Sequence, residues 1–167
     1  CEAIMAELEN VRSAWRSGLE NRDWQILAEM CQSLSWFYVI RRFAAEAQEA
    51  FGRAMQVFYP ADGDTSPLSA EQRNTLSGLM VCYYQSCLEV YNYDEARLTM
   101  DRMSRMTDVI TDRAMIAVID TALLPMRFQE IPPNFEEVLQ KNLQVLMTAG
   151  NEWAAADCLN LLAAVYM

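Results

Sequence analysis

The sequence contains no histidine, and its lysine occurs once, at Lys141. Histidine is the commonest general base and a common metal ligand in proteins, so the usual basis of acid–base and metal-dependent catalysis is missing. Lys141 has no glycine before it at the spacing of a phosphate-binding P-loop, and the glycines of a dinucleotide-binding fold are missing too. We therefore predict that this segment is not an enzyme, with no catalytic residue, no cofactor and no metal site.

Positive charge is also scarce. Thirteen Lys and Arg residues stand against 23 Asp and Glu residues, and only Arg41 and Arg42 are adjacent. A nucleic-acid surface needs clustered basic side chains. No apolar run approaches the ~18 residues of a membrane span, and Glu2 and Glu7 lie where a secretory signal would be basic. We expect neither nucleic acid nor a membrane as a partner.

Five cysteines are present, at Cys1, Cys31, Cys82, Cys87 and Cys158, without any CxxC spacing. Their number is odd, and several fall on apolar helical faces, where cysteine behaves as a small hydrophobic residue. This pattern favours reduced thiols and a cytoplasmic location.

The chain opens at Cys1 without an initiator methionine and stops at Met167 within the apolar stretch CLNLLAAVYM. An uncapped apolar helix end costs free energy in water. A length of 167 residues suits one domain. We expect residues 1–167 to be a single helical-repeat domain, cut from a longer multidomain protein.

Apolar residues recur at spacings of three and four along almost the whole chain, which predicts an all-α protein with about eight helices and no strand. Helix starts are predicted at the caps Asp23, Ser69 with Gln72, Asn92, and Asn134 with Glu137. The expected ranges are 2–19, 24–40, 43–58, 70–91, 93–109, 112–126, 134–149 and 151–167. Because most connections are short, we expect neighbouring helices to form antiparallel hairpins.

The stretch 24–60 fits the tetratricopeptide pattern, in which small residues beside large ones let two helices of a hairpin approach closely. The pattern recurs less fully in YNYDEARLTMDRM and LLAAVY. An ordinary amphipathic array containing alanines is the alternative. The residues that match are Leu34, Ser35, Tyr38, Ala47, Phe51, Ala54 and Pro60, then Tyr93, Ala96, Met100 and Met103, and finally Leu162, Ala163 and Tyr166.

Two segments carry a more particular resemblance: ELENVRSAW over 7–15, and the Glu46–Ala54 segment with its arginine and alanine at the end. Together with the turn NRDW and the later GNEWAAADCLNLLAAVY, they resemble the helical repeat region of bacterial signal-transduction ATPases with numerous domains. Transcriptional activators of the maltose-regulon and antibiotic-regulator types belong to that class. Cys31, Met103 and the glycine-free turn at Arg41 and Arg42 depart from the family pattern.

The resemblance implies an α-α superhelix of tetratricopeptide-like hairpins that follows an upstream ATPase module. Such a segment is a protein–protein or ligand-sensing module of a signalling or transcriptional regulator. It binds a protein, a peptide or a small inducer, and this shifts the ATPase module toward assembly. The alternative is a constitutive tetratricopeptide scaffold without switching. A stand-alone helical enzyme or carrier would need a polar pocket with titratable groups.

The repeat register predicts a binding strip on the concave face of the array, with Trp36 at its centre. A mixture of aromatic, amide and acidic side chains is typical of surfaces that bind peptides or small ligands. The alternative is that the strip contacts another helix of the same array. The predicted strip comprises Glu29, Gln32, Trp36, Val39, Val81, Gln85 and Glu89.

Overall fold

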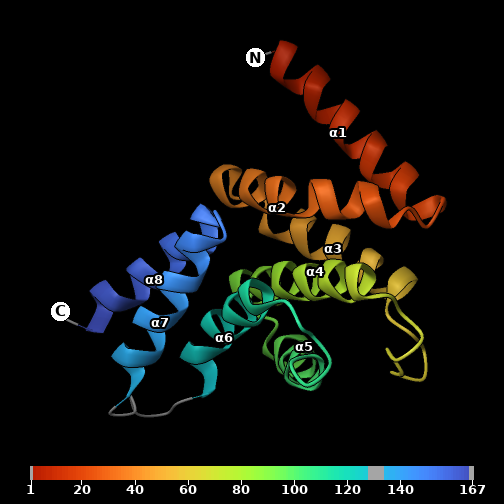
Figure 1. Ribbon diagram of the computed structural model, residues 1–167. Coiled ribbons are helices and arrows are strands. Elements are labelled where there is room, and N and C mark those ends of the chain that lie inside the picture. The colour runs from red at the N-terminus through yellow and green to blue at the C-terminus, as the bar shows by residue number, and fades with distance from the viewer. Residues whose placement is uncertain (1, 128–133, 166–167) are drawn as a thin grey trace. The chain divides into compact units, whose positions relative to one another are not determined.

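The computed structural model describes residues 2–127 and 134–165, with the side chains of residues 7–124 and 134–164. Within these residues the protein is all-α, with eight helices and no strand, as the apolar periodicity predicts (Figure 1). The helices are α1 Glu2–Glu20, α2 Trp24–Arg41, α3 Ala44–Phe58, α4 Ala70–Glu89, α5 Tyr93–Met106, α6 Arg113–Arg127, α7 Phe135–Thr148 and α8 Glu152–Val165.

Helices α2, α4, α5 and α7 begin directly after the predicted cap residues. The Asp23 carboxylate accepts hydrogen bonds from the backbone N–H groups of Gln25 and Ile26. Ser69 and Gln72 form the reciprocal capping box at the start of α4, with bonds of 3.2 and 2.9 Å. Each cap satisfies N–H groups that have no partner within the first turn of the helix.

The predicted helix start at Asn134 is confirmed, but the capping hydrogen bond that was expected with it is not formed. The backbone of Asn134 has a ψ angle of 11°, whereas a capping residue is normally extended so that its side chain reaches the first N–H groups. The preceding prolines, Pro132 and Pro133, lie outside the described residues.

Four links between helices share one local geometry. Arg22, Arg42, Tyr91 and Gly150 each adopt a left-handed backbone, with φ between 51° and 70°. At each link the next residue's N–H donates to a carbonyl of the preceding helix, over 2.8 to 2.9 Å, which satisfies that helix end. After three of these residues, an Asp or Asn then caps the following helix.

The prediction that helices joined by short turns form antiparallel hairpins is wrong for α4 and α5, which do not pack along each other. Figure 1 shows α5 end-on while α4 lies across the view. Tyr91 and Asn92 turn the chain between them, and Tyr83 of α4 donates a hydrogen bond to Glu95 near the start of α5. After this link the chain therefore runs in a direction that is not antiparallel to α4.

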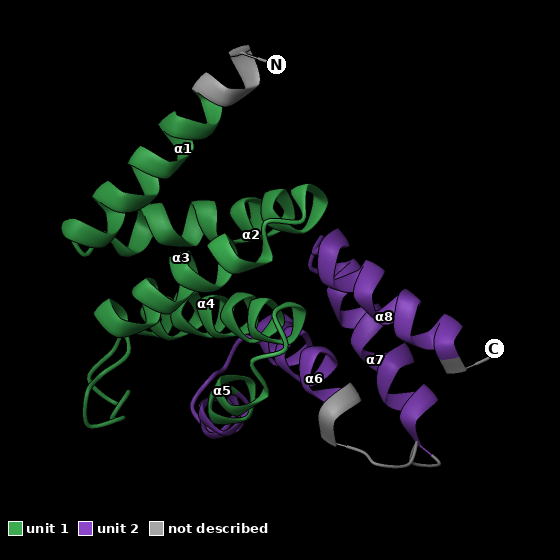
Figure 2. Ribbon diagram, turned by 180° about the vertical axis from the view of Figure 1, so that it is seen from behind, with its two compact units in different colours: residues 1–99 green, residues 100–167 purple. Residues whose placement is uncertain are grey.

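The chain divides into two compact units, residues 1–99 and residues 100–167 (Figure 2). In the first unit α2 packs against α1, α3 and α4, and α3 packs most extensively on α4. In the second unit each of α6, α7 and α8 contacts the other two. Helix α5 begins in one unit and ends in the other. That residues 1–167 form a single helical-repeat domain stays a prediction.

All but one of the residues in the first match to the packing pattern are buried, and Pro60 at its end is half-buried. The large and small members of this match alternate in the contact between α2, α3 and α4, where close approach requires small side chains. These buried residues are Leu34, Ser35, Tyr38, Ala47, Phe51 and Ala54.

The later matches are less complete. Ala96 and Met103 are buried, but the Tyr93 side chain is 54% exposed and pairs with Tyr91 at 6.3 Å. Ala163 is exposed, and Tyr166 lies outside the described residues. The small-and-large packing is therefore well developed only around α2 and α3.

Candidate binding surface

The two sequence segments that carry the family resemblance meet in the first unit. The Arg12 guanidinium of α1 binds both carboxylate oxygens of Glu46 in α3, each over 2.7 Å. Tyr38 of α2 donates its hydroxyl to the same carboxylate over 3.2 Å. Nearby, the rings of Trp15 and Phe51 pack edge to face at 5.6 Å. This cluster ties α1 to α2 and α3.

Charge and burial shift the pKa values in this cluster. The hydrogen bonds from Arg12 lower the pKa of Glu46, and the same pair raises the pKa of Arg12. Burial, followed by the negative charge of Glu46, raises the pKa of Tyr38. At neutral pH, Arg12 and Glu46 are therefore a stable ion pair and Tyr38 is a neutral donor. This arrangement joins α1, α2 and α3.

The predicted strip lies mainly on α2. Glu29 and Gln32 are exposed, Trp36 is 39% exposed and Val39 is 55% exposed. The sequence analysis missed Ile40, which is 70% exposed and lies one helical turn beyond Trp36. One feature of the sequence could have indicated its exposure. Apolar residues run around the whole circumference of α2, so that packing cannot cover all of them.

On α4 the strip is less complete. Glu89 is exposed and Gln85 is half-buried, but Val81 is buried, with only 1% of its surface exposed. The placement of Val81 on an open surface is therefore wrong. Its neighbours Met80 and Cys82 are buried as well, because α4 packs against both α2 and α3. Helix α2 alone presents a continuous exposed part of the predicted strip.

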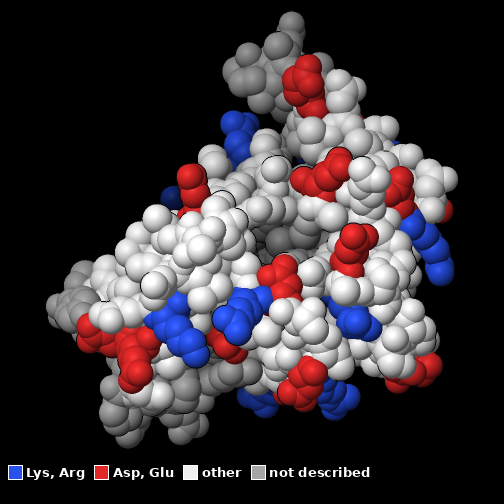
Figure 3. All heavy atoms as spheres, in the orientation of Figure 1, with Lys and Arg blue, Asp and Glu red and all other residues white. Residues whose placement is uncertain are grey.

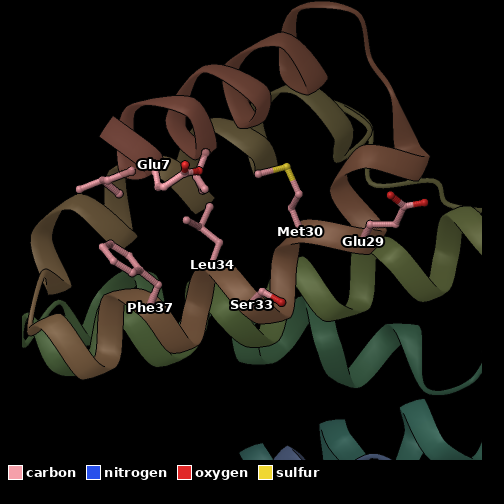
Figure 4. A pocket seen from close by; sticks show the side chains of 8 residues that line it. Glu7, Glu29, Met30, Ser33, Leu34 and Phe37 are labelled. Atoms are coloured by element: carbon pink, nitrogen blue, oxygen red, sulfur yellow. The ribbon is translucent and has the colours of Figure 1, made fainter. Parts of the chain in front are cut away.

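A groove of about 630 Å³ lies between α1 and α2, and the sequence analysis did not predict it (Figure 4). Leu8 and Leu34 are nearly buried at its base, whereas Val11 is 36% exposed. The apolar stripe of α1 was the only feature of the sequence that pointed to an apolar surface here. The lining residues are Glu7, Leu8 and Val11 of α1, with Glu29, Met30, Ser33, Leu34 and Phe37 of α2.

The groove exists because α1 and α2 touch at one end and diverge toward the other (Figure 1). At the closed end Gly18 lies so near Ile26 that a Cβ atom on Gly18 would be 2.9 Å from Ile26 Cγ2. A larger residue at position 18 would force the two helices apart. Close approach here and divergence toward the start of α1 leave the apolar walls uncovered.

The charges on the groove are all negative. Glu7 and Glu29 belong to opposite walls, and no Lys or Arg is among the lining residues. On the described part of the face in Figure 3, acidic and basic side chains are interspersed, without an extended basic patch. Within the described helices, none is both long and apolar enough to cross a membrane.

The described cysteines are free and buried. The Sγ atoms of Cys31 in α2 and Cys82 in α4 lie 3.4 Å apart, and this contact together with burial raises the pKa of Cys31. Cys158 lies 3.2 Å from the Thr121 hydroxyl in the second unit, and its pKa is also raised by burial. Enclosed thiols are poor nucleophiles, and Cys31 and Cys158 are both buried in the interior of their units.

None of the family models, curated proteins or solved structures compared with this chain matches it. The case for a function therefore depends on the geometry of the two surfaces on α2, its exposed strip and its groove with α1.

Proposed function

We propose that this chain is a non-catalytic, tetratricopeptide-like module that binds a protein or peptide through the outward face of α2. The observation that carries this proposal is the clustering of Trp36, Val39 and Ile40 on one exposed face. Single apolar residues on a surface are ordinary, but three large ones one turn apart form a patch. Tryptophan is among the residues that contribute most to protein interfaces.

The surroundings of the patch suit a binding surface. Glu29 and Gln32 lie on the same face and supply a polar border. Interfaces commonly combine an apolar centre with such a rim, which fixes the orientation of the partner. The opposite face of α2 is held rigidly by Leu27, Leu34 and Tyr38 in the core. Binding can therefore occur without reorganisation of the helix.

The packing order of the helices supports the repeat-like part of the proposal. In the first unit α2 contacts both its neighbour α3 and the next helix α4, and in the second unit α6 contacts both α7 and α8. Contact with the next helix and the next but one is what stacked hairpins require.

The wider proposal is that the chain is the sensing segment of a larger cytoplasmic regulator with an ATPase module. A ligand can switch such a regulator only if it binds two arrangements of the helices with different affinities. The alternative proposal is a constitutive scaffold. A change in amide exchange beyond α2 upon partner binding would favour the sensor, and protection confined to the contact face would favour the scaffold.

The test is site-specific photocrosslinking in the cells from which the chain comes. A photoreactive residue at position 39 should capture a defined protein, identified by mass spectrometry, and Trp36→Ala should abolish this capture. Leu159 of α8 is 52% exposed and provides the matched control as Leu159→Ala. Absence of a defined product, or equal loss in both variants, would contradict the proposal.

A further inference from the structure

We infer that the groove between α1 and α2 is the docking site for a basic amphipathic α-helix of a partner protein. This inference rests on the proposed function, since it assumes that the chain binds a protein. It adds the place on the chain where a partner binds and the kind of segment that binds there. The observations that carry it are the helical packing around the groove, its apolar walls and its acidic rim.

In the first unit, the groove between α1 and α2 is not covered by another described helix. The pair α2 and α3 has a helix on each side, because α4 contacts both and α1 contacts both. The pair α1 and α2 has α3 on one side, joined through Glu46 and Tyr38. On another side of the pair, among the described residues, lies the groove. A helix placed there would contact α1 and α2 as α4 contacts α2 and α3.

The walls suit a helix more than a small ligand. Leu8, Val11, Met30, Leu34 and Phe37 provide aliphatic and aromatic contacts from both helices. Apart from Ser33 and the two glutamates, the lining has no polar side chain, whereas small-molecule pockets use several convergent polar groups. An apolar helix face with anchors at i, i+3, i+4 and i+7 is the usual occupant of such a groove.

The acidic side chains of the groove favour a partner segment with positive charge. Glu7 projects from α1 and Glu29 from α2, so acidic groups border the apolar contact on both walls (Figure 4). Lys or Arg residues beside the apolar stripe of the incoming helix would meet opposite charges. Such complementarity mainly selects the partner and accelerates association, and salt weakens it.

The probe is a dye-labelled synthetic peptide of about four helical turns, with leucines on one face and lysines beside them. A second peptide carries glutamates in place of the lysines. Fluorescence anisotropy with the full 167-residue chain should show binding of the basic peptide, weakening as salt is raised, and much weaker binding of the acidic one.

Charge reversal of the groove provides the decisive variant. The double variant Glu7→Lys with Glu29→Lys should weaken binding of the basic peptide about tenfold and strengthen binding of the acidic peptide. The matched control is Glu20→Lys with Asp101→Lys, which makes the same change in net charge at exposed positions that do not line the groove. It should leave the preference for the basic peptide unchanged. Val11→Ser should weaken binding through lost apolar contact.

Each other outcome would overturn the inference. Equal binding of both peptides, or equal effects of the groove and control variants, would show that the groove does not select a basic helix. Self-association of the chain that the groove variant abolishes would assign the groove to a second copy. If neither peptide binds while crosslinking at position 39 still depends on Trp36, the inference about the groove is wrong and the proposed function is still supported.

Discussion

At the scale of single residues, Glu46 is the point where three helices are joined. It accepts both branches of the Arg12 guanidinium and the hydroxyl of Tyr38. A two-pronged pair of this kind is stronger than an ordinary surface ion pair because its geometry is fixed. The Glu46 side chain is 34% exposed, so solvent still screens the interaction.

This ion pair should make stability depend on pH. A carboxyl group with a lowered pKa stabilises the folded state only when ionised. The stabilisation is therefore present above the ordinary pKa of 4.5 and is lost as the pH falls through the lowered value. We expect Glu46→Gln to reduce the free energy of unfolding by about 1 kcal/mol at pH 7. In urea unfolding, the difference from the original chain should shrink below pH 4.5.

Glu49 is the control for this measurement. It lies on the same helix and pairs with Arg53, but both side chains are about two-thirds exposed. Glu49→Gln should therefore change the free energy of unfolding little at any pH. If the two variants behaved alike, the ion pair of Arg12 and Glu46 would have no special role.

Two buried tyrosines should respond oppositely to loss of the hydroxyl group. Tyr84 is 1% exposed, its hydroxyl has no partner among the described residues, and burial raises its pKa to about 12. Tyr84→Phe removes an unsatisfied group and should leave the free energy of unfolding unchanged or raise it by up to about 1 kcal/mol. Tyr38→Phe removes the bond to Glu46 and should lower it by about 1 kcal/mol. Thermal unfolding measures both changes, and a Tyr84→Phe variant as unstable as Tyr38→Phe would contradict this reasoning.

At the scale of the helices, the left-handed residue at the end of a helix sets how the chain enters the next one. Arg42 holds this conformation at the end of α2, with φ of 58°. A side chain there costs about 1–2 kcal/mol relative to the right-handed conformation. The carbonyls of Tyr38 and Val39 accept the N–H groups of the link, which keeps it in place despite that cost.

Glycine at this link should stabilise the protein. We expect Arg42→Gly to raise the free energy of unfolding by about 0.5 kcal/mol, because the relieved strain exceeds the extra entropy of an unfolded glycine. Arg41 is the control, since it lies within the last turn of α2 and over the ring of Phe43. Arg41→Gly should lower the free energy of unfolding by about 1 kcal/mol. In chemical denaturation, the two variants should change the free energy of unfolding in opposite directions. Changes of the same sign would contradict backbone strain at Arg42.

At the scale of the whole molecule, the described residues fall into two compact units. Phe51 is fully buried in the first unit and Leu139 is fully buried in the second. Among the described helices, the extensive helix–helix packing lies within one unit or the other, and α5 belongs partly to each. Each unit can therefore open locally with its own free energy.

Core truncations should act within their own unit. Phe51→Ala and Leu139→Ala each leave a cavity that costs about 2–5 kcal/mol. By amide hydrogen exchange, Phe51→Ala should accelerate exchange mainly in α1 to α4, and Leu139→Ala mainly in α6 to α8. Equal acceleration in all helices by either variant would show one cooperative fold and contradict two units.

Much of the local structure could be predicted from residues alone. The start of α2 at Asp23 and the capping box at Ser69 depend on neighbours only a few positions away, and both are confirmed. The burial of Ala47, Phe51 and Ala54 follows from their helical spacing. At Asn134 the predicted helix start is correct, but the side-chain capping bond is not formed, because it depends on a backbone angle that the residue type does not determine.

The binding surface shows where such prediction ends. Val81 and Val39 are the same residue type at similar positions in apolar helices, yet one is 1% and the other 55% exposed. The sequence by itself determined that α2 and α4 are helices with apolar residues on every side. Only the tertiary structure decided which face another helix covers, and where α1 and α2 diverge into a groove. Packing depends on contacts between distant segments, which no local pattern contains.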